Sequence, residues 1–204
     1  REHGSFWGGS EDLVLARMRP SKRIKHPGTL VVPDVLYNVP GPVAVAKGGK
    51  ARMVDRDRLV NSFCELVRID SPSDEEEEVA LHLVERLRRL GFQVDRDAHG
   101  NVIASEPGDD PLLLSAHMDT VEPGRGIKPQ VLGDRIESDG TTILGGDCKA
   151  GVASILEALE SVKDRNDARR PVQVVFTRGE EIGLVGASNL DYSMIRARES
   201  VVFD

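Results

Sequence analysis

The feature that most constrains this sequence is a short apolar run that ends in a histidine and an aspartate. The run Leu112–Ala116 reads LLLSA, and His117, Met118 and Asp119 follow it directly. Such a run is typical of a strand that is fully buried in a sheet. In open α/β sheets, ligands bind outside the carboxyl ends of the strands. We therefore predict that a buried strand delivers His117 to the functional edge of a sheet, although a surface loop histidine is the simpler alternative.

Charge, hydropathy and cysteine content exclude several classes of protein. The net charge of −7 argues against a nucleic-acid-binding surface. No apolar run approaches the ~18 residues that a membrane span needs. The two cysteines, Cys64 and Cys148, lack the CxxC spacing of a zinc finger and fit a reducing cytoplasm. We therefore expect a cytoplasmic protein with no nucleic-acid partner and no membrane partner.

Residues 1–52 differ in composition from residues 53–204. The first segment holds 5 of the 11 prolines and 7 of the 20 glycines, and they interrupt every apolar run in it. Runs such as 29–32 and 43–46 are too short to build a core alone. We predict that residues 1–52 form a disordered or loosely attached leader. A true start at Met53, with the preceding residues translated from upstream sequence, is an alternative that the sequence leaves open.

The remaining chain alternates between helical and strand patterns. Apolar residues at helical spacing predict a helix over 55–68, and a second helix begins after Ser71-Pro72-Ser73, with Ser73 or Asp74 as its cap, and ends at Gly91. Alternation of strands with helices predicts an α/β fold, a layered αβα sheet. The further elements that we predict are strands at 92–94, 102–104, 171–177 and 201–203, a hairpin around Gly133-Asp134, and helices at 149–162 and 188–196.

Acidic residues follow the predicted strands just as His117 does. Glu180 and Glu181 follow one strand, Asp204 follows another, and Asp147 precedes a helix. If the strands are parallel neighbours, these side chains project from one edge of the sheet. Carboxylates gathered around an imidazole in an apolar setting are costly unless a cation neutralises them. Imidazole and carboxylates together suit zinc or a similar divalent ion, and several carboxylates suit a pair of metals.

Three sequence motifs carry a resemblance to a known family. They are SAHMDT at 115–120, DGTTILGGDCKAG at 139–151 and FTRGEEIG at 176–183. In this order and context, the chain resembles the co-catalytic zinc exopeptidases that include peptidase T, carboxypeptidase G, aminoacylase and desuccinylases. The second motif is most similar to the peptidase T-like branch. The resemblance covers residues 55–204 and implies that residues 53–204 are the N-terminal part of a metallopeptidase catalytic domain.

The resemblance also implies a role for each acidic residue and for the histidine. His117 and Asp204 would bind one zinc, Glu181 would bind the other, and Asp147 would bridge the two. Asp119 would orient the imidazole of His117, and Glu180 would act as the general base on the attacking water. Cobalt or manganese could replace zinc. In this family the peptide bond after the bridging aspartate is cis, so we expect a cis bond between Asp147 and Cys148.

Two departures from the family pattern affect the prediction of a complete di-zinc site in this chain. Cys148 stands where the family usually has an aspartate that is not a ligand. The family also needs a further histidine after an inserted lid or dimerisation domain, and His3, His26, His82 and His99 do not occupy that place. We therefore expect the chain to be the N-terminal part of a longer enzyme, inactive when made alone. A homodimer through the lid domain is the assembly that the resemblance implies.

The function that these residues predict is hydrolysis of the amide bond of a short peptide by a di-zinc exopeptidase. Two alternatives stay open at the level of sequence. One is an N-acyl amino acid deacylase or desuccinylase with the same metal centre. The other is a non-catalytic metal-binding fragment, against which the presence of Glu180 argues.

Overall fold

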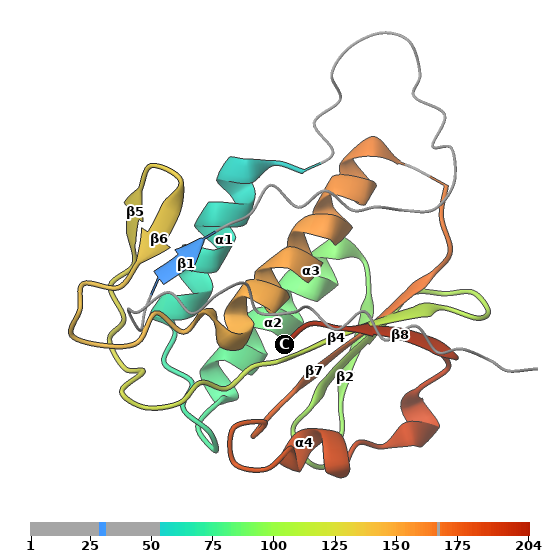
Figure 1. The fold of residues 1–204 in the computed structure, drawn as a ribbon. Coiled ribbons are helices and arrows are strands. Elements are labelled where there is room, and N and C mark those ends of the chain that lie inside the picture. Colours follow the sequence, from blue (N-terminus) through green and yellow to red (C-terminus); the bar gives the residue numbers. More distant parts are fainter. Residues whose placement is uncertain (1–28, 32–53, 167) are drawn as a thin grey trace, which may run out of the picture.

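The chain folds into a layered α/β structure. The computed structural model describes residues 29–31, 54–166 and 168–204. A mixed five-stranded sheet has helices on both of its faces, which confirms the predicted fold class (Figure 1). One face is covered by α1 (Arg56–Arg68), α2 (Glu77–Leu90) and α3 (Gly146–Arg165), and the other by the short helix α4 (Val185–Ser188) and the 3₁₀ helix η1 (Tyr192–Met194).

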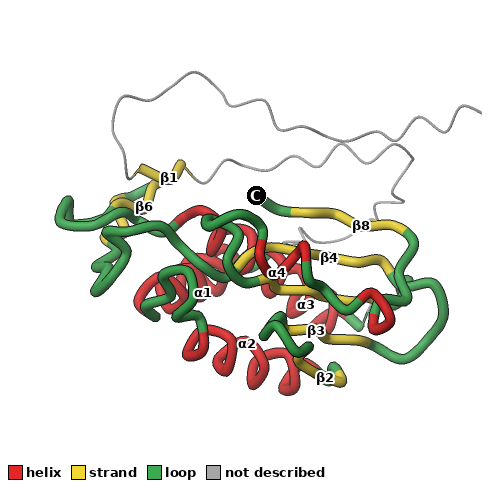
Figure 2. The backbone as a smooth tube through the Cα atoms, turned by 90° about the horizontal axis from the view of Figure 1, so that it is seen from below, coloured by secondary structure: helices red, strands yellow, loops and turns green. Residues whose placement is uncertain are grey.

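The strand order of the sheet determines where the functional residues meet. The order is β2-β3-β7-β4-β8, so β4 lies between β7 and β8, and both of these pairings are parallel. Figure 2 shows β8 beside β4. The three strands that we predicted to be parallel neighbours therefore end at the same edge. The strands of this sheet are β2 (Gln93–Arg96), β3 (Val102–Ser105), β4 (Leu112–His117), β7 (Val172–Thr177) and β8 (Glu199–Val202).

The burial of β4 differs from the prediction. Only Ala116 and His117 of this strand are buried, while Leu112 to Ser115 are partly exposed. The neighbouring strand β8 is exposed at all four of its positions. Among the described residues, the helical layers therefore cover the β3 and β7 side of the sheet better than the β8 side. The apolar run correctly predicted a strand, but the prediction that it is fully buried was wrong.

The start of α2 also differs from the prediction. The helix begins at Glu77 and has no side-chain cap, so neither Ser73 nor Asp74 caps it. The hydroxyl of Ser73 donates instead to Asp119 (2.6 Å), and Asp74 adopts a left-handed φ of 73°. The predicted end of the helix is confirmed, since Gly91 has a φ of 100° that favours glycine. Ser73 and Asp74, which the local rule predicted as caps, thus bind residues that are distant in the sequence.

The predicted helix over 188–196 is replaced by two shorter pieces, α4 and η1. Asp191 accepts a hydrogen bond from the backbone N–H of Ser193 and begins a new turn there. The buried side chain of Gln173 donates to Met194 O (2.8 Å) and accepts from Arg196 N (2.9 Å). These backbone groups bind the sheet rather than a helical neighbour, which explains why a continuous helix does not form.

A second, smaller sheet lies beside the main one. The predicted hairpin at Gly133 forms from β5 (Gln130–Leu132) and β6 (Arg135–Glu137). Strand β1 (Thr29–Val31) pairs antiparallel with β6. The other positions of the predicted leader lie outside the described residues, so the division of the chain at residue 52 stays a prediction.

Within the described residues, no helix is both long enough and apolar enough to cross a membrane.

Candidate metal centre

The carboxyl ends of three parallel strands and the start of one helix form the candidate site. β4 ends at His117, β7 leads into Glu180 and Glu181, and β8 leads into Asp204. Asp147 comes from the beginning of α3, after Gly145, whose φ of 71° turns the chain into the helix. Every residue that we predicted from the sequence is therefore positioned by the end of a regular element.

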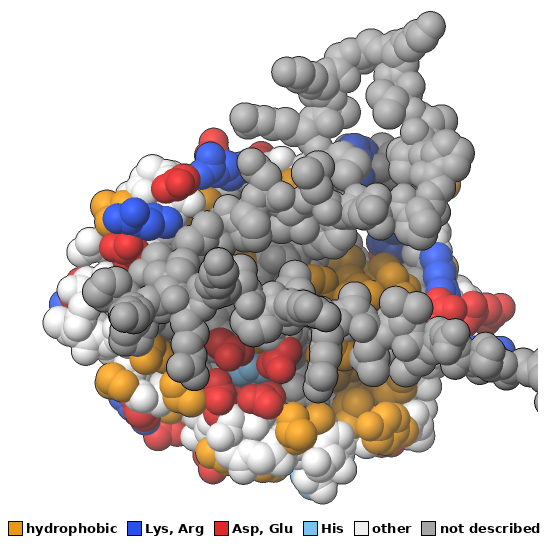
Figure 3. All heavy atoms as spheres, in the orientation of Figure 1, with side chains coloured by type: hydrophobic (Ala, Val, Ile, Leu, Met, Phe, Trp, Pro, Cys, Tyr) orange, Lys and Arg blue, Asp and Glu red, His pale blue; other side chains and the backbone are white. Residues whose placement is uncertain are grey.

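Three carboxylates face one nitrogen of His117. The Nε2 atom lies 3.0 Å from Asp147 Oδ1, 3.6 Å from Asp204 Oδ1 and 4.0 Å from Glu180 Oε2. The imidazole is only 3% exposed. Figure 3 shows the edge of a histidine ring framed by acidic side chains at the surface. The nearly buried imidazole of His117 thus has three acidic side chains beside its Nε2 atom.

The other nitrogen of His117 contacts Asp119. Nδ1 lies 3.3 Å from Asp119 Oδ1, and this buried nitrogen forms no hydrogen bond with the part of the chain that the structure describes. Asp119 is completely buried and accepts hydrogen bonds from Glu180 N (2.9 Å) and Glu181 N (3.1 Å). Asp119 therefore contacts the histidine and also holds the backbone of the two glutamates.

The electrostatics of the site favour positive charge. Burial lowers the pKa of His117, but the carboxylates of Asp119 and Asp147 outweigh burial and raise this pKa to about 10. Burial raises the pKa of Asp119, but its partners, His117 first among them, lower it to about 2. The hydrogen bond with His117 lowers the pKa of Asp147. The carboxylates around His117 therefore favour a cation at this place, whether a proton on the imidazole or a metal ion.

Glu181 lies at the margin of this group. It belongs to neither of the two sets of ligand atoms that lie within 4.8 Å of one another among the described residues. Burial, followed by the charge of Asp147, raises the pKa of Glu181. The charge of Asp147 raises this pKa and that of His117 lowers it, so the carboxylate of Glu181 interacts electrostatically with both residues.

The residues at the site fit a divalent cation. The two sets of close ligand atoms are His117 with Asp147 and Cys148, and His117 with Glu180 and Asp204. Imidazole and carboxylate oxygens are suitable donors for first-row divalent metals. Among the described residues, no lysine or arginine forms an ion pair with any of the five carboxylates. The described part of the chain thus supplies no lysine or arginine to balance this negative charge.

Cys148 fills a structural position in the site. The Asp147-Cys148 peptide bond is cis, as the resemblance implied. The buried thiol donates to Phe203 O (3.1 Å), next to Asp204, and burial raises its pKa to about 12. A thiol that stays protonated is a poor metal ligand. Cys148 therefore ties the start of α3 to the end of β8.

Of the other histidines that the structure describes, neither joins the site. His82 lies on α2, with its Nε2 3.9 Å from Glu65 Oε1, and His99 lies in the turn between β2 and β3. His3 and His26 lie outside the described residues.

Comparison with known proteins agrees with this geometry. A family model described as Peptidase family M28 matches residues 101–202, which is half of the chain. The chain belongs to this peptidase family. Membership implies a divalent metal, which the donor set of His117 and the carboxylates fits.

The relatives of this M28 chain include both curated proteins and solved structures. The chain is 40% identical to the uncharacterized protein YqjE of Bacillus subtilis (strain 168), covering 74% of this chain and 44% of YqjE. The structure of aminopeptidase PepT from Bacillus cereus ATCC 10987 is similar, with a TM-score of 0.72 and 41% identity. The match covers 74% of this chain and 44% of the PepT chain. A tripeptidase from Staphylococcus aureus subsp. aureus Mu50 is similar with a TM-score of 0.72, 38% identity and the same coverage. The chain spans less than half the length of the curated relatives YqjE, cytosol non-specific dipeptidase and peptidase T.

Sequence reasoning missed three residues that contact the site from the segment between α1 and α2. Ser71 donates to Met118 O, Ser73 donates to Asp119, and Glu76 accepts from Gly179 N. The signal was the polar motif Ser-Pro-Ser followed by acidic residues. It was interpreted as a helix boundary, because local rules relate such residues to capping.

Proposed function

We propose that the full-length protein containing this chain is a di-zinc exopeptidase that hydrolyses the amide bond of short peptides. The observation that carries this proposal is the convergence of three carboxylates on Nε2 of the buried His117, at 3.0 to 4.0 Å. Two similar structures are described as a tripeptidase and as an aminopeptidase, which supports a short-peptide substrate.

The proposed ligands divide between two metals. His117 and Asp204 would hold one zinc, Glu181 would hold the other, and Asp147 would bind both. When bound, the two ions would polarise the substrate carbonyl and make water a stronger nucleophile near neutral pH. Glu181 belongs to neither of the two sets of close ligand atoms that include His117, which supports its assignment to the other metal. Cobalt or manganese could serve in place of zinc.

Two residues would act without ligating metal in this proposal. Glu180 would accept a proton from the attacking water on its carboxylate and return that proton to the leaving amine. Asp119 would hold His117 through Nδ1 and fix the loop of Glu180 through the backbone N–H of that residue. A fixed base matters because small displacements of reacting groups cost large factors in rate.

The experiment that tests this proposal is a substrate panel on the purified full-length protein. Tripeptides, dipeptides and N-acyl amino acids would be assayed before chelation, after chelation, and after zinc is restored. We expect zinc-dependent release of amino acids from tripeptides. Hydrolysis of only N-acyl amino acids would favour the deacylase or desuccinylase alternative, and zinc binding without any turnover would favour a non-catalytic metal-binding protein.

Location and assembly remain part of the proposal. We infer a cytoplasmic enzyme from the buried, unpaired Cys64 and Cys148. Assembly as a homodimer through a further domain stays a prediction, which size-exclusion chromatography with light scattering would test.

A further inference from the structure

The segment Ser71–Glu76, here called the strap, contacts both loops that carry the proposed catalytic residues. It connects α1 to α2 and was predicted only as a helix boundary. One of these loops, 117–120, follows β4, and the other, 178–181, follows β7. Neither loop belongs to the same element as the strap. The contacts of the strap are therefore tertiary, and each of them holds part of one of the two loops in place.

One end of the strap binds the loop after β4. The hydroxyl of Ser71 donates to Met118 O (3.0 Å), and Thr120 N donates to Ser71 O (3.0 Å). Pro72 and Thr120 form an isolated parallel bridge. Ser71 and Thr120 are almost completely buried. The strap thus extends the sheet beyond the end of β4 and fixes the backbone on both sides of Asp119.

The other end of the strap binds the loop after β7. Glu76 is only 5% exposed, and its Oε1 accepts from Gly179 N (2.9 Å). Its Oε2 lies 3.7 Å from Arg178 Nε, and the guanidinium of Arg178 also donates to Asp74. The backbone immediately before Glu180 is therefore held by a buried carboxylate from the strap.

Ser73 lies between these two ends and contacts the residue that joins the loops. Its hydroxyl donates to Asp119 Oδ2 (2.6 Å), the same oxygen that accepts from Glu181 N (3.1 Å). The other oxygen of Asp119 accepts from Glu180 N and lies 3.3 Å from His117 Nδ1. Each carboxylate oxygen thus has two neighbours. The Ser73 hydroxyl is the only one of the four that belongs to neither catalytic loop.

We propose that Ser73 is a positioning residue of the metal centre, which sets the rotation of the Asp119 carboxylate and through it the placement of His117, Glu180 and Glu181. The proposal rests on the proposed function for its catalytic consequence, but not for its geometry. Without the hydroxyl, one oxygen of a fully buried carboxylate loses a charge-assisted hydrogen bond. Asp119 can then rotate toward the remaining donors, which loosens the backbone N–H groups that depend on it.

The test compares Ser73→Ala with Ser73→Thr, which keeps the hydroxyl, in the full-length protein. Ser154→Ala is the matched control, because it removes a serine hydroxyl that bonds Ala150 O within α3. Three quantities are measured: amide hydrogen exchange at Glu180 and Glu181 in metal-free protein, zinc affinity by calorimetry, and kcat and KM for a tripeptide. Exchange at the core residue Leu83 reports global unfolding in each variant.

For Ser73→Ala we expect faster exchange at Glu180 and Glu181 by about tenfold, since a hydrogen bond to a charged group is lost. Exchange at Leu83 should stay unchanged. Zinc affinity should fall by roughly 10–100-fold, the usual effect of losing a partner of a metal ligand. The loss of turnover should appear in kcat rather than in KM. Ser73→Thr and Ser154→Ala should stay near wild type in every measurement.

Several outcomes would overturn the proposal. Equal acceleration at Leu83, Glu180 and Glu181 would show that Ser73 only stabilises the fold. Unchanged exchange and zinc affinity in Ser73→Ala would show that Asp119 needs no help from the strap. If no peptide is hydrolysed by any variant, yet exchange and zinc affinity respond as expected, the proposed function fails while the positioning role of Ser73 stands.

Discussion

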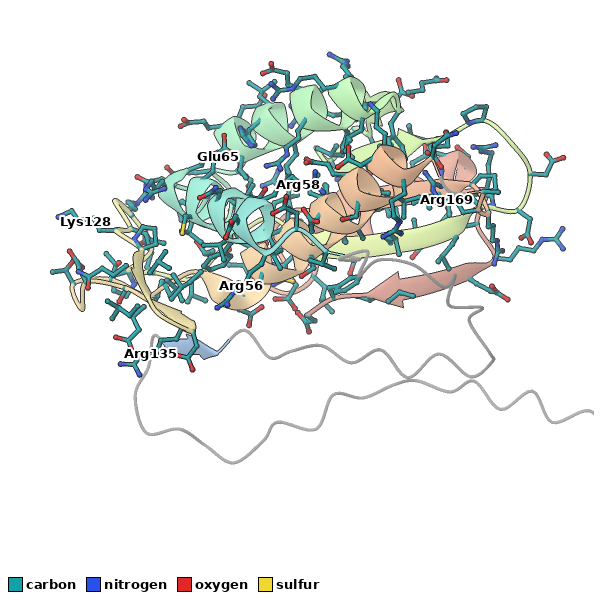
Figure 4. All side chains as sticks on the ribbon, turned by 90° about the horizontal axis from the view of Figure 1, so that it is seen from above. Arg56, Arg58, Glu65, Lys128, Arg135 and Arg169 are labelled. Atoms are coloured by element: carbon teal, nitrogen blue, oxygen red, sulfur yellow. The ribbon has the colours of Figure 1, made fainter. Side chains whose placement is uncertain are left out.

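The two halves of helix α3 each carry a cluster of acidic side chains, and the two clusters differ in whether a basic side chain pairs with them. Toward the C-terminal end, Glu157 is only 2% exposed and binds Arg58 through both oxygens, at 2.6 and 3.0 Å. We call this group, with Glu160, Ser161 and Asp164, the Arg58 cluster; Figure 4 shows Arg58 reaching from α1 toward α3. At the N-terminal end, Asp147 joins the carboxylates of Asp119, Glu180 and Asp204 around the imidazole of His117.

The difference between the clusters lies in the source of the neutralising cation. The Arg58 cluster contains its own guanidinium. In this cluster, Glu157 Oε1 also accepts hydrogen bonds from Ser161 Oγ and Asp55 N. Among the described residues, the carboxylates of the metal centre have no lysine or arginine partner. The side chains of Asp147 and Asp204 are 71% and 69% exposed, so water screens part of the repulsion at the candidate metal centre. The first cluster therefore carries its own cation, whereas the second can accept a metal ion as its cation.

The largest effect that would test this contrast concerns turnover. We expect Glu180→Gln to lower kcat by roughly 10²–10⁴-fold, since a general base contributes about that factor. Its zinc content should stay near that of the wild type, because Glu180 is not a proposed ligand. Glu181→Gln should lose both turnover and zinc. Steady-state kinetics with metal analysis by mass spectrometry would check this in the full-length protein.

Glu160→Gln, a change within the Arg58 cluster, is the matched control for these two variants and should keep wild-type turnover and zinc content. Equal loss of metal in Glu180→Gln and Glu181→Gln would contradict the separate roles of base and ligand.

A smaller effect should separate the clusters in stability. Glu157→Gln should lower the free energy of unfolding by about 3 kcal/mol, because it leaves Arg58 with an incomplete set of partners. In metal-free protein, Glu181→Gln should leave the free energy of unfolding unchanged or raise it, because the fold disfavours the charged form of Glu181. Urea unfolding of both variants in the presence of a chelator would measure the difference. A marked destabilisation by Glu181→Gln without metal would remove the contrast.

The smallest effect concerns pH. Burial raises the pKa of Glu157, but Arg58, Ser161 and the backbone of Asp55 outweigh burial and lower it below its usual range. A depressed pKa stabilises the fold above the unfolded pKa of about 4.3, and this contribution is lost as pH falls through the lower folded value. We therefore expect the stability gap between wild type and Glu157→Gln to be full at pH 6 and to shrink below about pH 4. Urea unfolding across this range would measure it, and a gap that does not change with pH would contradict the role of the ionised carboxylate.

Local patterns were sufficient to predict many elements of the fold. The helix predicted over 55–68 forms as α1 from Arg56, with Asp55 as a cap whose side chain accepts from Arg58 N, and Gly91 ends α2 as predicted. The hairpin at Gly133 formed for the same reason. In each case the decisive interaction lies within a few residues of chain. A local sequence pattern can therefore predict these elements, because the residues that form the interaction are part of the pattern.

Predictions failed where distant residues took part. The cap of α2 was wrong because Ser73 bonds Asp119, 46 residues away, and Glu76 bonds Gly179, 103 residues away. The helix predicted at 188–196 was interrupted because Gln173 binds Met194 O and Arg196 N. Strand β1 pairs with β6 across more than 100 residues, and no local signal indicates that partner.

The sequence by itself determined the candidate metal donors and the edge of the sheet where they gather. Apolar runs specify strands, and the residues after parallel strands must project from one side. Only the tertiary structure decided that Nε2 of His117 faces Asp147, Asp204 and Glu180, that Glu181 stands apart, and that Ser73 holds Asp119. Those choices depend on side-chain contacts between elements far apart in the chain, which no spacing of residues encodes.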